Sequence, residues 1–178
     1  MIGFLRFVGL MNAAVWFGAA FFFTFGIGPA PFSGEMKELL GQKNAPYFSG
    51  AIAQILVARY FYFQLICGTV ALLHLVGEWV YLGRTPRSIP LGLLIGLVSV
   101  GLISGHFLQP KLKALHKTKY AVDASATARE TAARSFRAWH GVSQGINLLL
   151  LAGLTVYLWK IGNPSDSTRF VSTSKFRG

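Results

Sequence analysis

Four apolar blocks, each about as long as a membrane is thick, constrain this chain more than any other feature of its sequence. The hydrocarbon core of a bilayer is roughly 30 Å thick, and a helix needs about 20 apolar residues to cross it. Lipid cannot hydrogen-bond the backbone, so each block is predicted to be a helix. A membrane β-barrel would instead show alternating segments of about 10 residues. The predicted spans are 7–28, 60–82, 90–108 and 139–159.

The composition agrees with a membrane protein and limits the classes that remain. Only 13% of the residues are charged and the mean hydropathy is +0.49, whereas soluble domains carry about 25% charged residues. The net charge of +11 raises the question of nucleic-acid binding. We exclude it, because the positive residues lie between apolar blocks, where they face anionic lipid headgroups. The sequence therefore predicts an all-α, integral membrane four-helix bundle over 1–162, followed by a polar, basic tail over 163–178.

The tryptophans agree with these spans. Trp79, Trp139 and Trp159 lie at block ends, where aromatic rings prefer the headgroup level of a membrane. Trp16 lies deep within the first block, so we expect it to pack inside the bundle.

The linkers carry most of the polar residues. The first linker, 29–59, includes the amphipathic stretch 47–56, which is predicted to run along the membrane surface before the second span. A short polar turn at 84–87 joins the second and third spans. In the third linker, 110–138, Thr127 and Glu130 have the spacing of a capping box. That linker is therefore predicted to be partly helical and to continue into the fourth span.

Four spans leave both termini on one side of the membrane, here called side A, and the opposite side is called side B. Side B has slightly more Lys and Arg, which favours side B as cytoplasmic in the cell's inner membrane. Side A carries Arg6, Arg84, Arg87, Lys160, Arg169, Lys175 and Arg177; side B carries Lys37, Lys43, Arg59 and seven more in the third linker.

Polar residues inside the spans form two seams. Intramembrane polar groups usually face the interior of a bundle, and residues three or four apart share one helix face. Six glycines at small-xxx-small spacing predict close helix packing: Gly92, Gly96, Gly101, Gly105, Gly141 and Gly145. The second span carries Gln64, Cys67, Ala71, His74 and Glu78, and the fourth carries His140, Ser143 and Asn147, with Gln144 beside them.

Two pairs are candidate ligands. His74 and Glu78, at i and i+4, have donor types that hold a metal ion or share a proton; the alternative is a hydrogen-bonded structural pair. His106 and His140 approach side B from two spans and together suit haem b or another transition metal; the alternative is interhelical hydrogen bonding. We expect no cofactor, with haem b or a metal ion as the alternative. No nucleophile–base motif, phosphate loop or dinucleotide fingerprint is present.

Three stretches resemble the transmembrane protein 205-like family of bacterial membrane proteins of unknown function. Residues 136–147 are similar to its Phe-x-x-x-His-x-x-Ser-x-x-x-Asn pattern, and 108–113 resemble its exit from the third span. Residues 16–18 and 29–32 are similar to its first helix and exit. The resemblance implies a four-span bundle and names no reaction. The matching positions, for which a structural role is expected, are Trp16, Gly18, Pro110, His140, Ser143 and Asn147.

Three functions remain open on the sequence. The first is non-enzymatic binding or movement of a small solute or metal species, suggested by the polar seams. The second is a haem- or metal-binding redox protein using His106 and His140. The third is an accessory subunit of a larger membrane complex, which docks through its basic linker and tail. Membrane lipids are expected partners in each case, and a homo-oligomer would supply the width that transport needs.

Overall fold

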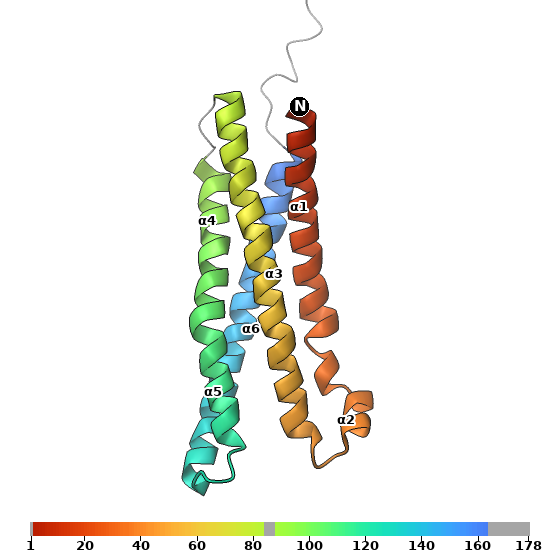
Figure 1. The fold of residues 1–178 in the computed structure, drawn as a ribbon, viewed down its shortest axis with the longest axis vertical. Helices are drawn as coiled ribbons and strands as arrows, with labels where there is room; N and C mark the ends of the chain where they lie inside the picture. Colours follow the sequence, from red (N-terminus) through yellow and green to blue (C-terminus); the bar gives the residue numbers. More distant parts are fainter. Residues whose placement is uncertain (1, 84–87, 164–178) are drawn as a thin grey trace, which may run out of the picture.

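A computed structural model of the chain describes residues 2–83 and 88–163 and consists of helices in four long rods (Figure 1). The predicted turn at 84–87, and the tail from residue 164 onwards, lie outside the described residues. The elements in order are α1 (Ile2–Phe22), η1 (Phe23–Ile27), η2 (Ala30–Phe32), α2 (Gly34–Leu40), α3 (Ala45–Leu82), α4 (Ser88–Ile103), η3 (Ser104–Leu108), α5 (Gln109–Lys119) and α6 (Ala126–Gly162).

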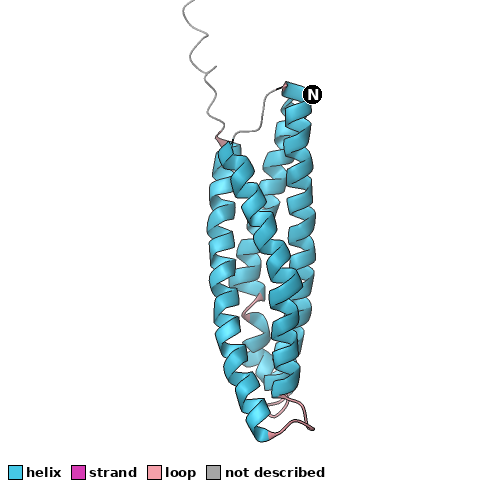
Figure 2. Cartoon of the chain, turned by 90° about the vertical axis from the view of Figure 1, so that its left-hand side faces the viewer, coloured by secondary structure: helices cyan, strands magenta, loops and turns pink. Residues whose placement is uncertain are grey.

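The four rods form one bundle, which confirms the predicted all-α fold. Helix α1 packs against α3 and α6, α4 packs against the same two helices, and α5 packs on α6. The start of α1 and the end of α6 lie at the same end of the bundle, as Figures 1 and 2 show. Four stretches are long and apolar enough to cross a membrane: Gly3–Phe32, Ala45–Tyr81, Ile89–Lys119 and Ala126–Gly162. The protein is therefore a multi-pass membrane protein.

The surface of the bundle is apolar, unlike the surface of a soluble protein. Large apolar side chains such as Phe4, Leu73 and Leu149 are exposed, as lipid-facing residues should be. Trp16, which the sequence places inside the bundle, is 1% exposed, and its indole meets the edge of the Tyr157 ring. A compact core surrounds this pair and includes Ala20, Ala71, Leu94, Leu97 and Leu154.

The interfacial tryptophans give the position of the membrane. Trp139 and Trp159 are 20 residues apart along α6, which corresponds to roughly 30 Å and equals the thickness of the hydrocarbon core. Both rings are exposed. At side B, the Lys111 ammonium lies 3.7 Å from the centre of the Trp139 ring, so the headgroup level there runs close to Lys111.

The first linker differs from its prediction. Residues 47–56 do not lie on the membrane surface as a separate segment, because they are the opening turns of α3. Two contacts hold this extension of α3 against α5. Tyr47 stacks on His116 of α5, and the Tyr120 hydroxyl donates a hydrogen bond to the Pro46 carbonyl at 3.0 Å. The amphipathic pattern of 47–56 is therefore the pattern of a helix that packs on α5 beyond the bilayer.

The start of α6 was predicted two residues too late. Ser125, not Thr127, is the N-cap, and its hydroxyl accepts from the backbone N–H of Ala128 at 3.2 Å. Glu130 does not complete a capping box but pairs with Arg134 one turn later, at 3.2 Å. The prediction that this helix continues into the fourth span is correct.

Two of the six predicted glycines lie at helix contacts, because a methyl group at Gly101 or Gly105 would meet Gln64 or Phe61 of α3 at 3.6 Å. The tighter contacts use other glycines. A methyl group added at Gly92, Gly96, Gly141 or Gly145 would meet no atom within 4 Å, so within the chain these residues do not bring helices together. A methyl group at Gly68 would approach Val98 at 2.9 Å, and one at Gly153 would approach Leu97 at 2.9 Å. Helices α3, α4 and α6 thus meet closely at Gly68 and Gly153.

Candidate functional site

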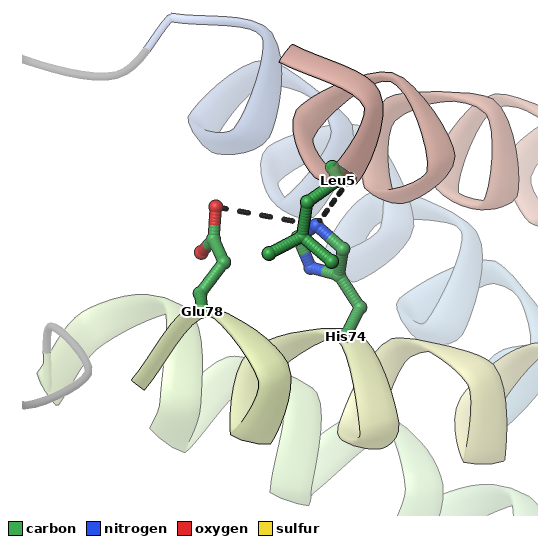
Figure 3. Close-up of polar contacts among 3 residues, drawn as sticks. All are labelled: Leu5, His74 and Glu78. Atoms are coloured by element: carbon green, nitrogen blue, oxygen red, sulfur yellow. Dashed lines mark hydrogen bonds and ion pairs between the residues drawn. The ribbon is translucent and has the colours of Figure 1, made fainter. Parts of the chain in front are cut away.

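His74 ties α3 to α1 near side A. Its Nε2 lies 2.8 Å from the Leu5 carbonyl oxygen and 4.0 Å from Glu78 Oε1 (Figure 3). Both neighbours are acceptors, so Nε2 carries the proton and donates to Leu5. The ring is nearly buried and fills the space that Gly9 leaves by having no side chain.

The structure therefore brings His74 and Glu78, the predicted metal ligands, together, and His74 Nε2 already donates to the Leu5 carbonyl. No group of three or more His, Cys, Asp or Glu side chains gathers anywhere in the described part of the chain. The residues fit a two-donor structural pair better than a metal cage, which usually takes four ligands. A metal at His74 and Glu78 stays a prediction.

A second polar network joins three helices near side B. The Tyr60 hydroxyl on α3 donates to Asn147 Oδ1 on α6 at 3.2 Å, and Asn147 Nδ2 donates to Thr24 Oγ1 at 2.7 Å. Thr24 in turn donates to the Ala20 carbonyl at 2.6 Å. The Phe23 ring lies flat on Tyr60, with 4.0 Å between ring centres. Asn147, predicted from the seam of the fourth span, is thus the centre of an interhelical network.

Beside this network lies a cavity of about 410 Å³, which we call the α1–α3–α6 cavity. Such a volume lies within the range of small-molecule sites. Its apolar wall comes from residues such as Phe32, Leu56 and Leu150. The polar side chains that line it are Thr24, Tyr60, Gln64, Ser104, His140, Ser143, Gln144 and Asn147. The fourth-span seam predicted from the sequence therefore faces this cavity.

Gln64 is the most unusual member of the lining. It is 3% exposed, and its amide lies near the Tyr60 hydroxyl. That hydroxyl donates to Asn147 instead, and neither atom of the Gln64 amide makes a hydrogen bond of good geometry among the residues that the structure describes. An unpaired buried amide costs free energy, so such groups in folded proteins normally have a partner. The Gln64 amide atoms have almost no accessible surface, so a molecule in the cavity reaches this unsatisfied group when a neighbouring side chain moves aside.

Two π-helices contribute hydroxyl groups to the same cavity. Thr24 belongs to η1 and Ser104 belongs to η3. In each case an i to i+5 bond closes the wide turn, from Gly28 N–H to Phe23 and from Gln109 N–H to Ser104. Turns of this kind are rare and recur at functional sites. Their meeting at one cavity supports it as the functional centre.

The cavity reaches from the headgroup level into the bilayer. Its lining begins at Pro29 and Ala53, on the side B end of the bundle, and extends to Leu150. Trp139 marks the headgroup level at side B, and His140 is the next residue, so His140 lies close to the membrane surface. Because no Asp, Glu, Lys or Arg lines the cavity, it suits an uncharged molecule.

The predicted haem ligands lie in different surroundings. His106 is exposed, donates from Nδ1 to the Leu102 carbonyl of its own helix at 3.1 Å, and lines another cavity. His140 lines the α1–α3–α6 cavity and stacks on Phe136 at 5.8 Å. The structure does not bring the two rings to one cavity, and bis-histidine haem ligation stays a prediction.

Sequence reasoning missed His116, the most buried histidine of the described chain. It is 5% exposed, its Nε2 has no partner among the described residues, and its ring contacts Tyr47, Tyr120 and Phe136. It lies in the third linker, where no apolar period pointed to burial. No spacing pattern linked it to Tyr47, which contacts it from the first turn of α3.

The remaining motif positions have diverse environments. Trp16 is a core residue, and Pro110 lies in the first turn of α5, where its missing N–H costs little. A methyl group at Gly18 would meet nothing within 4 Å. Ser143 lines the cavity and has no hydrogen bond in the described structure.

Comparison with known proteins gives one family. Residues 11–121, more than half of the chain, match the model of a family described as domain of unknown function (DUF4149). No curated protein and no solved structure matches the chain. The match runs from the middle of α1 to the end of α5. It includes Thr24, Tyr60, Gln64 and Ser104 and ends before the α6 residues of the site.

Proposed function

The chain belongs to the family described as domain of unknown function (DUF4149), and we propose that it binds a small, uncharged, polar solute in its α1–α3–α6 cavity. The observation that carries this proposal is Gln64, a buried amide without a partner at the wall of a cavity that also offers hydroxyl groups. A solute with a carbonyl, amide or hydroxyl group would complete its hydrogen bonds.

The chemistry of the wall selects the solute. A charge inside this cavity would lie among apolar and neutral groups with no counter-ion, and burying an unpaired charge is expensive. The hydroxyls of Ser104 and Ser143, which unlike that of Thr24 make no hydrogen bond in the described structure, donate and accept equally well. They therefore suit neutral polar groups of either kind. The site is small, so it admits a metabolite-sized molecule and not a polymer.

The route to the cavity follows from its position. The lining reaches the headgroup level at side B, near His140 and Pro29, so we propose that the solute enters from side B. Because side B has slightly more Lys and Arg than side A, we propose that side B faces the cytoplasm and that the membrane is the inner membrane of the cell. Asn147 is eight residues from Trp139, and Gln64 lies one turn deeper than Tyr60, the partner of Asn147. Gln64 would then hold the solute about three helical turns below the membrane surface.

Cysteine accessibility tests this proposal directly. Cys67 is the only cysteine, so Cys67→Ala gives a background without thiols. In that background, Ser143→Cys places a thiol in the cavity, and Leu149→Cys, on the exposed apolar face of the same helix, is the control. Each variant in vesicles is treated with three methanethiosulfonates that carry a neutral hydroxyethyl, a cationic or an anionic group.

We expect the neutral reagent to modify Ser143→Cys about tenfold faster than either charged one, after correction for their rates with a free thiol; a tenfold ratio is about 1.4 kcal/mol. Leu149→Cys should react slowly with all three, because a thiol in lipid does not ionise. Equal rates with charged and neutral reagents would contradict the proposed selectivity. Equal rates at Ser143→Cys and Leu149→Cys would contradict access to the cavity.

A further inference from the structure

A second cavity of about 460 Å³ lies on the other side of α3, between that helix and α4–α5, and we call it the α3–α4 cavity. It is elongated. Its lining on the α4–α5 rod runs from Leu97 to Lys113, 16 residues or roughly 24 Å of helix. Only Phe61 and Gln64 line both cavities, so α3 separates two distinct sites.

The lining changes in character with depth. At the side B end it is polar and positive, with His106, Gln109 and Lys113. Lys113 is two residues from Lys111, whose contact with Trp139 marks the headgroup level. At the deep end it is apolar, with Leu97, Val98 and the Trp16 indole. The cavity therefore has the same sequence of layers as half of a bilayer.

The charge at the mouth has no counter-ion. Lys113 is the only formally charged residue of the lining and is exposed, and none of the lining residues is an Asp or Glu. A lysine near a membrane surface attracts an anionic headgroup by about 1 kcal/mol. The mouth therefore favours a negative group.

Two buried polar groups inside the cavity also lack partners. The Gln64 amide and the Trp16 indole N–H have none among the described residues. Trp16 is 1% exposed and Gln64 is 3% exposed, so bulk solvent does not satisfy them. The inner wall of the cavity is therefore dry, which suits a hydrocarbon chain.

We propose that the α3–α4 cavity binds an anionic phospholipid of the surrounding bilayer. The phosphate lies at the mouth, where Lys113, Gln109 and His106 bind it. The glycerol esters lie just below His106, and one acyl chain runs past Gly101 along Leu97 and Val98 to Trp16. A negative headgroup followed by hydrocarbon matches the order of the lining residues, which distinguishes this lipid from a soluble anion or an uncharged lipid.

Trp16 reports occupancy of this cavity. Replacing the other three tryptophans (Trp79→Phe, Trp139→Phe and Trp159→Phe) leaves Trp16 as the only indole of the full chain. The protein is placed in phosphatidylcholine vesicles that contain a small fraction of either phosphatidylglycerol or phosphatidylcholine with brominated acyl chains, which quench tryptophan on contact. Trp16 is buried, so only a chain inside the cavity reaches its ring.

We expect brominated phosphatidylglycerol to quench Trp16 more strongly than the same fraction of brominated phosphatidylcholine. Lys113→Gln should lower this preference about fivefold, the equivalent of 1 kcal/mol. Lys117→Gln is the matched control, because Lys117 is another exposed lysine of α5 that does not line the cavity. Equal quenching by the two lipids, or equal effects of the two substitutions, would overturn the proposal.

Native mass spectrometry of the unmodified protein gives a second readout if the triple variant does not fold. Retention of phosphatidylglycerol over phosphatidylcholine, reduced by Lys113→Gln alone, supports the site, and equal retention overturns it. The result is independent of the proposed solute site, because Lys113 is absent from the α1–α3–α6 cavity and Ser143 is absent from the α3–α4 cavity. Failure of either proposal leaves the other standing.

Discussion

Asn147 on α6 and Thr24 on η1 are joined by a 2.7 Å hydrogen bond across 123 residues of sequence. The same Asn147 side chain accepts from Tyr60 on α3. One amide therefore fixes the relative positions of three of the four rods at the depth of the α1–α3–α6 cavity. Its role is to hold the wall of that cavity in place.

Replacing Asn147 with leucine, which has a similar volume, should destabilise the bundle by about 1–2 kcal/mol. Interhelical hydrogen bonds in membranes contribute about 0.6 kcal/mol on average and up to about 1.7 kcal/mol, and Asn147→Leu removes two. Reversible unfolding in a denaturing detergent measures the loss. Ser143→Ala, four residues away and without a hydrogen bond in the described structure, should change little, and a comparable loss there would contradict this assignment.

Gly9→Ala should destabilise the protein by about 1–3 kcal/mol, the usual cost of overpacking. The new methyl group would occupy the position of the His74 ring and displace it from the Leu5 carbonyl. Gly3→Ala is the control on the same helix, because a methyl group there meets nothing within 4 Å. Detergent unfolding of both variants should separate them, and an equal effect would show that helix propensity, and not the His74 contact, sets the cost.

Gln64→Leu should stabilise the protein by about 1 kcal/mol, since it removes a buried amide without a partner. The same substitution should abolish solute binding, because the group that the solute satisfies is lost. Gln144→Leu, at an exposed residue of the same cavity, should give no comparable gain. Loss of stability in Gln64→Leu would mean that the amide already has a partner in the membrane.

A cysteine at Val122 tests the orientation. Val122 lies in the loop between α5 and α6 at side B and is 95% exposed. In the Cys67→Ala background, Val122→Cys should resist a membrane-impermeant maleimide applied to intact cells and react once the cells are opened. Labelling of intact cells would reverse the proposed orientation and place the mouth of the α1–α3–α6 cavity outside.

The fold follows from the sequence because the lipid environment leaves few alternatives. A run such as 139–159 has one stable form in a bilayer, and the structure has a helix there. Outside the bilayer the same reasoning is weaker. The stretch 47–56 fits a surface helix as well as an extension of α3, and only the contacts of Tyr47 with His116 decide between them.

The candidate site was predicted only in part. His140, Ser143 and Asn147 follow helical spacing, so their common face could be read from α6 alone. Thr24, Tyr60 and Ser104 could not be added, because a cavity depends on how three helices meet. The two π-turns that bring Thr24 and Ser104 inward have no residue pattern of their own, so they were invisible before the structure.

These two π-turns also have an evolutionary meaning. A turn closed by an i to i+5 bond holds one residue more than an α-helical turn, so each is equivalent to a single-residue insertion. Removing that residue would rotate the following segment by about 100° about the helix axis. After the first π-turn that segment begins at Pro29, and after the second it includes Pro110. Among related chains, the presence or absence of these two insertions should therefore separate lineages that retain the cavity from lineages that have lost it, even where the surrounding apolar residues have diverged.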